Sequence, residues 1–333
     1  MGWWQISTDT LAGSRFVISP LAETTATLFA LERGAPAHPG ERGWFEAHGP
    51  AYRERLAADP PAAELVRAAR GNGWNADFMT PAPGAHPAPV PEGDGSAAFA
   101  RELVRIRETP PEAVRADLAV AQGRPVPERL VRSDPAGRVA DLLEWVWTET
   151  VLPYWPARRR ICEADVVART RQLTLGGWAA ALDDMRPRMR WLGEGRLQIN
   201  TRAYPPREVS DAQLVFVPVT PRSGWVCWEE NPPYRYAVVY PCTGPAAVLG
   251  GAGEPDALGR LLGPYRARVL LLLDTPKSTT QLAGLTGMAL GSVGRHLKVL
   301  LDARLVVRQR AGRSVLYSRT TAGDGLVAAQ SEA

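Results

Sequence analysis

The stretch that decides the fold is LGSVGRHLKVLLDARLVVRQRAGRSVLYSR, residues 290–319. Its first half predicts a helix from about residue 289 to 304, because apolar side chains recur there at helical spacing. These side chains are Leu290, Val293, Leu297, Leu300 and Leu301. Its second half predicts a β-hairpin, because two alternating runs flank a turn at residues 311–314. Since each helical residue turns by about 100°, Arg295 should point away from the apolar stripe.

The residues before this stretch complete a three-helix unit. Residues 258–274 predict one helix, which Pro276 ends. Ser278-Thr-Thr-Gln281 matches a capping box, so a short second helix should begin there, and Thr286-Gly287 supplies the turn that follows it. The order of helix, helix-turn-helix and hairpin predicts a winged helix-turn-helix domain over residues 257–322.

This predicted domain is strongly basic. Residues 258–320 contain 2 Lys and 9 Arg against 2 Asp, a formal charge of +9. The whole chain has 39 basic and 35 acidic residues, so the remainder holds 28 against 33 and carries −5. Because a DNA duplex bears about one negative charge per 1.7 Å of axis, the composition predicts double-stranded DNA as the partner of this module.

The predicted DNA contacts lie on the outer face of the third helix, in the second helix and along the hairpin. A helix in the major groove presents its outer side chains to bases and phosphates, and hairpin arginines can meet phosphates or enter a minor groove. The predicted contacts are Thr279, Ser292, Arg295, His296, Lys298, Arg308, Arg310, Arg313 and Arg319. For His296, the alternatives are a plain surface residue or a partner for the hairpin.

From Arg266 to Tyr317 the chain resembles the ArsR/SmtB family of bacterial winged-helix repressors. Residues 293–300, Val-Gly-Arg-His-Leu-Lys-Val-Leu, match that family's recognition-helix pattern Val-Ser-x-His-Leu-x-x-Leu. Residues 312–317, Gly-Arg-Ser-Val-Leu-Tyr, match its wing. The resemblance implies a homodimer, an inverted-repeat operator and repression that a signal relieves.

Two departures from the family limit what the resemblance implies. Gly294 stands where the family has Ser, which removes one expected side-chain contact. Metal-sensing members carry Cys-x-Cys in the first helix of the helix-turn-helix, or Asp and His on a C-terminal helix. Residues 278–285 contain neither Cys nor His, and residues 321–333 contain no His. No metal site is therefore predicted.

Residues 1–250 predict a helical body followed by an antiparallel sheet, so that the whole chain is α+β. The predicted helices are 21–33, 44–57, 62–70, 97–107, 111–121 and 139–171, the last interrupted at Pro153 and Pro156. The predicted strands are 189–199, as a hairpin around Gly193-Glu-Gly195, and 213–219, 225–228 and 234–240. Residues 4–18 predict an extended segment or hairpin, and residues 80–96, with five Pro and three Gly, a loop. The arginines of residues 157–173 are expected to form a solvated face paired with Glu163 and Asp165.

This N-terminal region resembles the long N-terminal region of a subset of ArsR-like regulators. Ser19-Pro-Leu-Ala-Glu, Tyr154-Trp-Pro and Tyr240-Pro-Cys carry that likeness. All 11 Trp precede residue 229, and large aromatic side chains are usually core. The alternative is an aromatic pocket for a small-molecule effector. Its candidate residues are Trp145, Trp147, Trp155, Trp178, Trp225 and Trp228.

Other function classes find little support in the sequence. The longest dense apolar run, Val269–Leu273, is far shorter than the roughly 20 residues of a membrane helix, and no export signal is evident. The three cysteines Cys162, Cys227 and Cys242 fit a reducing cytoplasm, as buried thiols or, alternatively, as oxidation sensors. No nucleophile, phosphate-loop or dinucleotide motif appears, so neither a cofactor nor an enzyme activity is predicted.

The leading hypothesis is a DNA-binding transcriptional regulator, a repressor by the family's habit. It would bind an inverted repeat as a homodimer, with the N-terminal region sensing a small molecule or forming the dimer interface. Two alternatives stay open: an N-terminal enzyme that the winged helix localises or dimerises, and an architectural DNA-binding protein without an effector.

Overall fold

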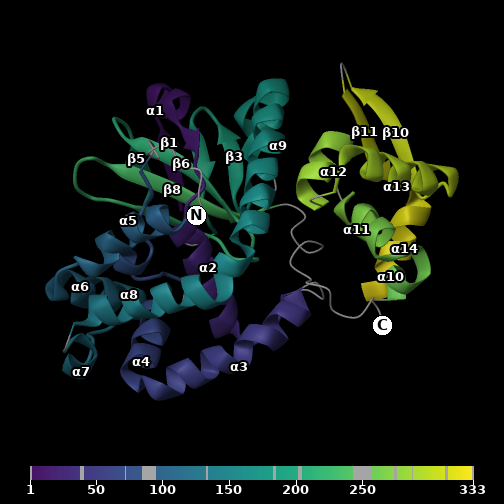
Figure 1. Ribbon diagram of the computed structural model, residues 1–333. Coiled ribbons are helices and arrows are strands. Elements are labelled where there is room, and N and C mark those ends of the chain that lie inside the picture. Colours follow the sequence, from purple (N-terminus) through teal and green to yellow (C-terminus); the bar gives the residue numbers. More distant parts are fainter. Residues whose placement is uncertain are drawn as a thin grey trace. The chain divides into compact units, whose positions relative to one another are not determined.

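The computed structural model describes most of the chain, and the described residues fall into two compact units, labelled by element in Figure 1. Unit 1 comprises Met1–Gly34, His48–Pro156 and Asp165–Cys242, and unit 2 comprises Ala35–Ala47, Ala157–Ala164 and Thr243–Ala333. The described residues are 2–37, 41–71, 73–84, 95–132, 134–182, 185–201, 205–242, 257–273, 276–286, 288–311 and 314–331.

Unit 1 contains two four-stranded sheets. The first has the order β3-β4-β1-β5, with β1 Trp3–Ile6, β3 Arg190–Gly193, β4 Arg196–Gln198 and β5 Arg207–Val209. The second has the order β2-β6-β8-β7, with β2 Arg15–Phe16, β6 Gln213–Val219, β7 Trp225–Trp228 and β8 Arg235–Pro241. In the second sheet β2, β6 and β8 run parallel, and β7 pairs antiparallel with β8 at the edge.

The α+β class is therefore confirmed, but the prediction of an antiparallel sheet is wrong for the β6–β8 pair. Strand β8 passes between β6 and β7 and pairs in parallel with β6 over seven residues, from Gln213–Arg235 to Val219–Pro241. Both strands are almost continuously apolar and buried on both faces, which is typical of parallel strands inside a sheet. That pattern was the available sequence signal for the parallel arrangement.

Of the two alternatives for residues 4–18, an extended segment or a hairpin, the hairpin is wrong. Strands β1 and β2 belong to different sheets, and the short helix α1 Thr8–Gly13 lies between them. Ser7 caps this helix, since its hydroxyl accepts a hydrogen bond from the Thr10 amide at 3.2 Å. An N-cap serine was the missed signal.

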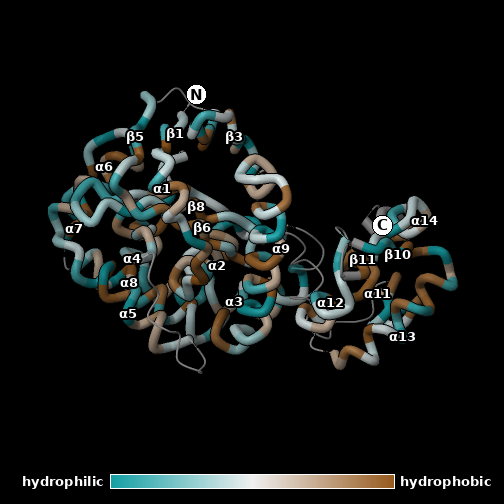
Figure 2. Tube along the Cα trace, turned by 90° about the horizontal axis from the view of Figure 1, so that it is seen from above, coloured by the Kyte–Doolittle hydropathy of each residue, from teal (hydrophilic) through white to brown (hydrophobic). Residues whose placement is uncertain are grey.

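The core of unit 1 lies on both faces of the β6–β8 pair. On one face Trp4, Leu197, Phe216 and Tyr240 belong to one cluster of buried side chains. The other face receives α2 Pro20–Arg33, which is buried from Pro20 to Leu31 and contacts β6. Figure 2 shows the hydrophobic (brown) stretches gathered around β6, β8 and α2.

The helices between β2 and β3 largely follow the predicted ones. They include α3 Arg42–Ala58, α4 Pro60–Ala69, α5 Ser96–Arg107, α6 Pro111–Gln122, α7 Glu128–Val131, α8 Pro135–Val146 and α9 Trp155–Leu182. A π-helical turn at Trp147–Val151 and a 3-10 turn at Leu152–Tyr154 separate α8 from α9, near the predicted interruption. A short 3-10 turn, η2 Asp77–Met79, precedes residues 80–84 of the predicted loop, and residues 85–94 lie outside the described ones.

The arginines of α9 do not all lie on a solvated face as predicted. Arg159 pairs with Glu163 at the surface as expected, with 2.8 Å between Nε and Oε1. Arg169 is instead 4% exposed, donates to the Ala181 carbonyl at 3.0 Å, and lies over the ring of Tyr240. Tyr240 in turn donates to Asp165 at 2.8 Å, so this part of α9 is joined to β8 by a buried polar network.

Unit 2 contains the predicted winged-helix elements. The described elements are α10 Ala257–Leu262, α11 Pro264–Leu272, β9 Lys277–Ser278, α12 Thr279–Thr286, α13 Leu290–Asp302, β10 Val306–Ala311, β11 Ser314–Arg319 and α14 Thr321–Ser331. The strands form one sheet in the order β10-β11-β9. No helix among the described residues of either unit is long and apolar enough to cross a membrane.

Two details of unit 2 differ from the prediction. Residues 258–274 form two helices rather than one, because Gly263 adopts a positive φ of 82° and Pro264 begins α11. Helix α14 was not predicted, although its cap is visible in the sequence: the Thr320 hydroxyl accepts from the Gly323 amide at 3.1 Å.

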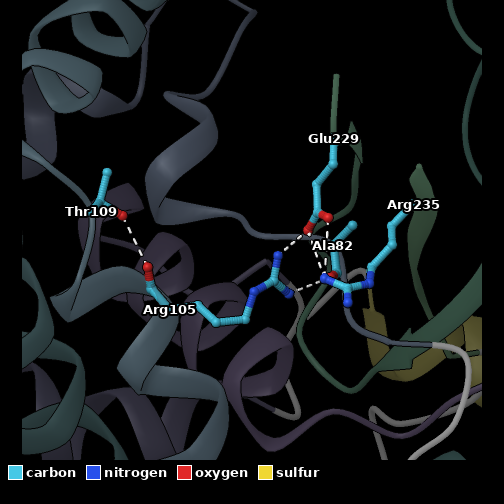
Figure 3. Close-up of polar contacts among 5 residues, drawn as sticks. All are labelled: Ala82, Arg105, Thr109, Glu229 and Arg235. Atoms are coloured by element: carbon cyan, nitrogen blue, oxygen red, sulfur yellow. Dashed lines mark hydrogen bonds and ion pairs between the residues drawn. The ribbon is translucent and has the colours of Figure 1, made fainter. Parts of the chain in front are cut away.

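A charged network joins the helices of unit 1 to its second sheet (Figure 3). Glu229, just after β7, pairs with Arg105 of α5 and with Arg235 of β8, the latter at 3.1 Å. Arg105 also donates to the Ala82 carbonyl. All three charged side chains are partly shielded, with 23–36% of each exposed. One carboxylate thus pairs with two guanidinium groups.

A second tie joins α5 to the start of α2. Glu102 accepts hydrogen bonds from the Leu21 amide at 2.9 Å and from the Ser19 hydroxyl at 2.8 Å. Burial raises the pKa of Glu102 to about 7, although these two hydrogen bonds act in the opposite direction.

We predict that Glu229→Gln lowers the free energy of unfolding by about 1–3 kcal/mol, because it leaves two partly shielded arginines without their carboxylate. Urea denaturation followed by circular dichroism measures the change. Glu194→Gln is the matched control, since Glu194 is 88% exposed in its pair with Arg196 and should contribute little. Equal effects of the two substitutions would contradict the structural role of Glu229.

Glu102 predicts a specific pH dependence of stability. A carboxyl whose pKa is raised on folding stabilises the protein below its unfolded pKa, 4.5, and that contribution is lost as pH rises through about 7. Between pH 5 and 8 we expect the wild type to lose of the order of 2–3 kcal/mol relative to Glu102→Gln. Denaturation of both proteins at a series of pH values measures the difference, and a pH-independent difference would contradict the prediction.

Candidate nucleic-acid interface

The position of α13 is set by its apolar face. Val293, Leu297 and Leu300 are buried, as predicted, and face the other helices of unit 2. Leu290 was predicted to share this face but is 55% exposed, because it is the first residue of the helix. The buried seam fixes the rotation of α13 about its axis and so decides which side chains point outward.

The predicted capping box at the start of α12 is confirmed. The Ser278 amide donates to Gln281 Oε1 at 2.8 Å, and the Gln281 amide donates to Ser278 Oγ at 3.2 Å. This reciprocal pair defines where α12 begins and therefore where Thr279, its first residue, lies. Thr279 is half-buried at this helix start.

The outer face of α13 is polar and open. Arg295 is exposed, and its Nη2 donates to the Ser292 hydroxyl at 3.0 Å, so two predicted contact residues lie together. Lys298 is also exposed. Gly291 and Gly294 add no side chain to the helix, and an ideal Cβ at either would have no neighbouring atom within 4 Å. The helix backbone is thereby accessible next to Arg295.

His296 has a partner within unit 2. Its ring stacks on Tyr265 of α11, with 6.0 Å between ring centres and 16° between planes. Burial, and then the positive charges of Arg266 and Arg295, hold the pKa of His296 below its usual value. These effects favour the neutral imidazole, and its ring joins α13 to α11 rather than to the hairpin.

Two of the hairpin arginines in the described part of the chain are exposed. The register pairs Arg308 with Tyr317 and Arg310 with Val315, and both arginines are exposed. Figure 1 shows this hairpin projecting beyond the helices of unit 2. Arg313 lies outside the described residues.

Arg319, at the base of the hairpin, is used inside the protein. It shares a hairpin face with Arg308 and Arg310, since strand residues two apart lie on one face. Its Nε donates to Asp324 of α14 at 2.7 Å, and its Nη1 lies 3.4 Å from the carbonyls of Leu270 and Leu271. The side chain is 14% exposed. Helix α14, which supplies this ion pair, was not predicted from the sequence, and the DNA contact of Arg319 stays a prediction.

Sequence reasoning did not single out Arg304 as a site residue. It follows α13, is exposed and has a positive φ of 57°, and its carbonyl accepts from the Thr320 hydroxyl at 2.8 Å. Its charge was counted in the basic module, but its position at the junction of helix and hairpin depends on the fold. Arg304 adds one more exposed cation to unit 2.

The six candidate tryptophans of unit 1 do not come together around one cavity. Trp147 stacks on Phe99 at 4.8 Å and contacts Trp155 at 5.4 Å. The remaining ring contacts are separate: Trp145 with Tyr52, Trp178 with Phe216, Trp225 with Phe29, and Trp228 with Trp4 and Trp74. Trp225 and Trp228 are three residues apart on β7 and so point to opposite faces of the sheet. These rings mainly fill the core.

The cysteines are likewise part of the interior. Cys162, Cys227 and Cys242 are buried free thiols. Burial, and then the negative charge of Asp77, raise the pKa of Cys227 to about 12. Cys227 is therefore an unreactive thiol at neutral pH.

Comparison with known proteins identifies the class of the C-terminal domain. Residues 261–309 match a family model described as a helix-turn-helix domain. No curated protein and no solved structure matches the chain. The matched residues run from α10 to β10 and include Arg295 and its surroundings, so DNA binding and transcription regulation are the functions that this domain indicates.

We predict that Gly294→Ala stabilises unit 2 by about 0.5–1 kcal/mol, because alanine favours the helix and its methyl group meets no neighbour. Gly323→Ala is the matched control. There the new Cβ would lie 2.2 Å from the Leu305 carbonyl oxygen, so destabilisation is expected. Thermal unfolding of both variants measures the changes, and a loss of stability in Gly294→Ala would show that α13 packs differently.

Proposed function

We propose that this protein is a transcriptional repressor that binds an inverted-repeat DNA operator as a homodimer through unit 2. Helix α13 enters the major groove with Arg295 toward the bases, and the hairpin places Arg308 and Arg310 against the backbone. Unit 1 senses a small molecule that changes the affinity for DNA.

The observation that carries the proposal is the outward position of Arg295. The buried seam of α13 directs this side chain to solvent, and Ser292 holds it by a hydrogen bond. Gly291 and Gly294 keep the adjacent helix surface bare. A bare, cationic helix face allows close approach to base edges, where an arginine binds guanine by two hydrogen bonds.

Regulation by an effector requires only a modest difference in binding free energy. If the effector binds the DNA-free form better, DNA occupancy falls as the populations shift. A hundredfold change in operator affinity corresponds to about 2.7 kcal/mol of coupling between the two sites, which is within the usual range. With two compact units, DNA and the effector can each bind to a separate domain.

We predict that the protein binds the DNA flanking its own gene selectively and that Arg295→Ala weakens this binding by about 1–3 kcal/mol, with relaxed sequence preference. Fluorescence anisotropy with labelled duplexes measures the affinity, and a half-site duplex tests the homodimer. Arg53→Gln, at an exposed position of unit 1, controls for the loss of one positive charge. Wild-type affinity in Arg295→Ala would remove α13 from the interface.

A hairpin arginine should behave differently. Arg310→Ala is expected to weaken binding to all sequences alike and to reduce the slope of log affinity against log salt concentration by about 1, because one phosphate contact is lost. The same anisotropy titration at several salt concentrations measures the slope. An unchanged slope would place Arg310 away from the DNA backbone.

A further inference from the structure

Arg186 is a cation of unit 1 at the carboxyl ends of parallel strands. It lies between α9 and β3, and its Nη2 donates to the carbonyl of Gly224, the residue before β7, at 3.3 Å. A Cβ at position 224 would lie 3.3 Å from Arg186 Nε and 3.4 Å from the ring of Pro241, the last residue of β8. Because β6 and β8 run parallel, this is the edge of the sheet where both strands end.

The guanidinium of Arg186 has no acidic partner among the described residues. Its Nη1 is shielded from solvent and meets no acceptor in the described part of the chain. Burial lowers the pKa of Arg186 to about 10. Two other partly buried arginines differ: Arg235 pairs with Glu229, and Arg319 pairs with Asp324.

A partly buried cation without a counter-ion is costly, because water solvates its charge incompletely. Gly224 itself leaves no room for a side chain, since its Cβ would lie 2.7 Å from the Val239 carbonyl oxygen. The unmatched Nη1 of Arg186 thus lies at an edge where open sheets with parallel strands commonly bind ligands.

We propose that Arg186 binds the carboxylate of a small organic acid at this edge of the sheet. A carboxylate accepts two parallel hydrogen bonds from one guanidinium. Its single negative charge balances the single unmatched cation, whereas a phosphate dianion would leave one negative charge over. Binding depends on unit 1 alone; the role of the acid as effector rests on the proposed function.

Thermal unfolding of the full chain tests the binding. Acetate, propionate and benzoate are each compared with chloride at equal ionic strength, at up to about 100 mM. We expect at least one carboxylate to raise Tm by about 3 °C or more in the wild type and to leave Arg186→Met unchanged. Arg186→Met without the acid should be as stable as the wild type or more so, because an unmatched charge is removed.

Arg222→Met, at an exposed position in the connection from β6 to β7, is the matched control and should keep the wild-type response. No carboxylate-specific shift in the wild type, or an equal shift in Arg186→Met, would overturn the proposal. A strong loss of stability in acid-free Arg186→Met would also overturn it, because an internal partner would then be implied. Asp183 and Asp184 lie outside the described residues, so Asp183→Asn with Asp184→Asn, measured in the same way, tests them as that partner.

The same acid is added to the anisotropy titration with DNA. Release of DNA in the wild type but not in Arg186→Met supports the acid as effector. A Tm shift without an effect on DNA keeps the binding site and removes its regulatory role. Absence of any selective DNA binding contradicts the proposed function and leaves the thermal result valid.

Discussion

Strands β6 and β8 are buried on both faces, and the arrangement of unit 1 depends on that burial. A side chain on either face of this pair needs an apolar cover, so one face packs on the cluster around Trp4 and Phe216 and the other on α2. Strands β6 and β8 can pair in parallel because β7, which lies between them in the sequence, runs along the outer side of β8 and not between the two. The ends of β6 and β8 then meet at one edge, beside Arg186 and Gly224.

Unit 2 uses the same principle with a single helix. Burial of Val293, Leu297 and Leu300 leaves Arg295 no direction but outward. His296 marks the border of that outer face, since its ring stacks on Tyr265 while its neighbour Arg295 faces solvent. The core of the domain and its proposed DNA surface are therefore two sides of one helix.

Local patterns predicted the parts of the fold that local physics decides. Helical periodicity located α13, and Ser278 with Gln281 located the start of α12 from side-chain and backbone groups only three residues apart. The order β2-β6-β8-β7 was not predicted, because strand pairing joins residues far apart in the chain. The internal partners of Arg169 and Arg319 were not predicted for a related reason. An arginine in the sequence looks like a surface residue until its partners, here Tyr240 and Asp324, are brought to it by the fold.

The attachment of the hairpin to α11 and α14 through Arg319 has a mechanical consequence. The guanidinium of Arg319 is held by carbonyls at the end of α11 and by the carboxylate of Asp324, so the hairpin is fixed at its base. If a bound duplex bent against the far end of the hairpin, the force would act on Arg319. It would reach α14 through the ion pair with Asp324 and not through an apolar contact. High salt would therefore weaken the ion pair between Arg319 and Asp324 as well as screen the phosphate charges of the duplex.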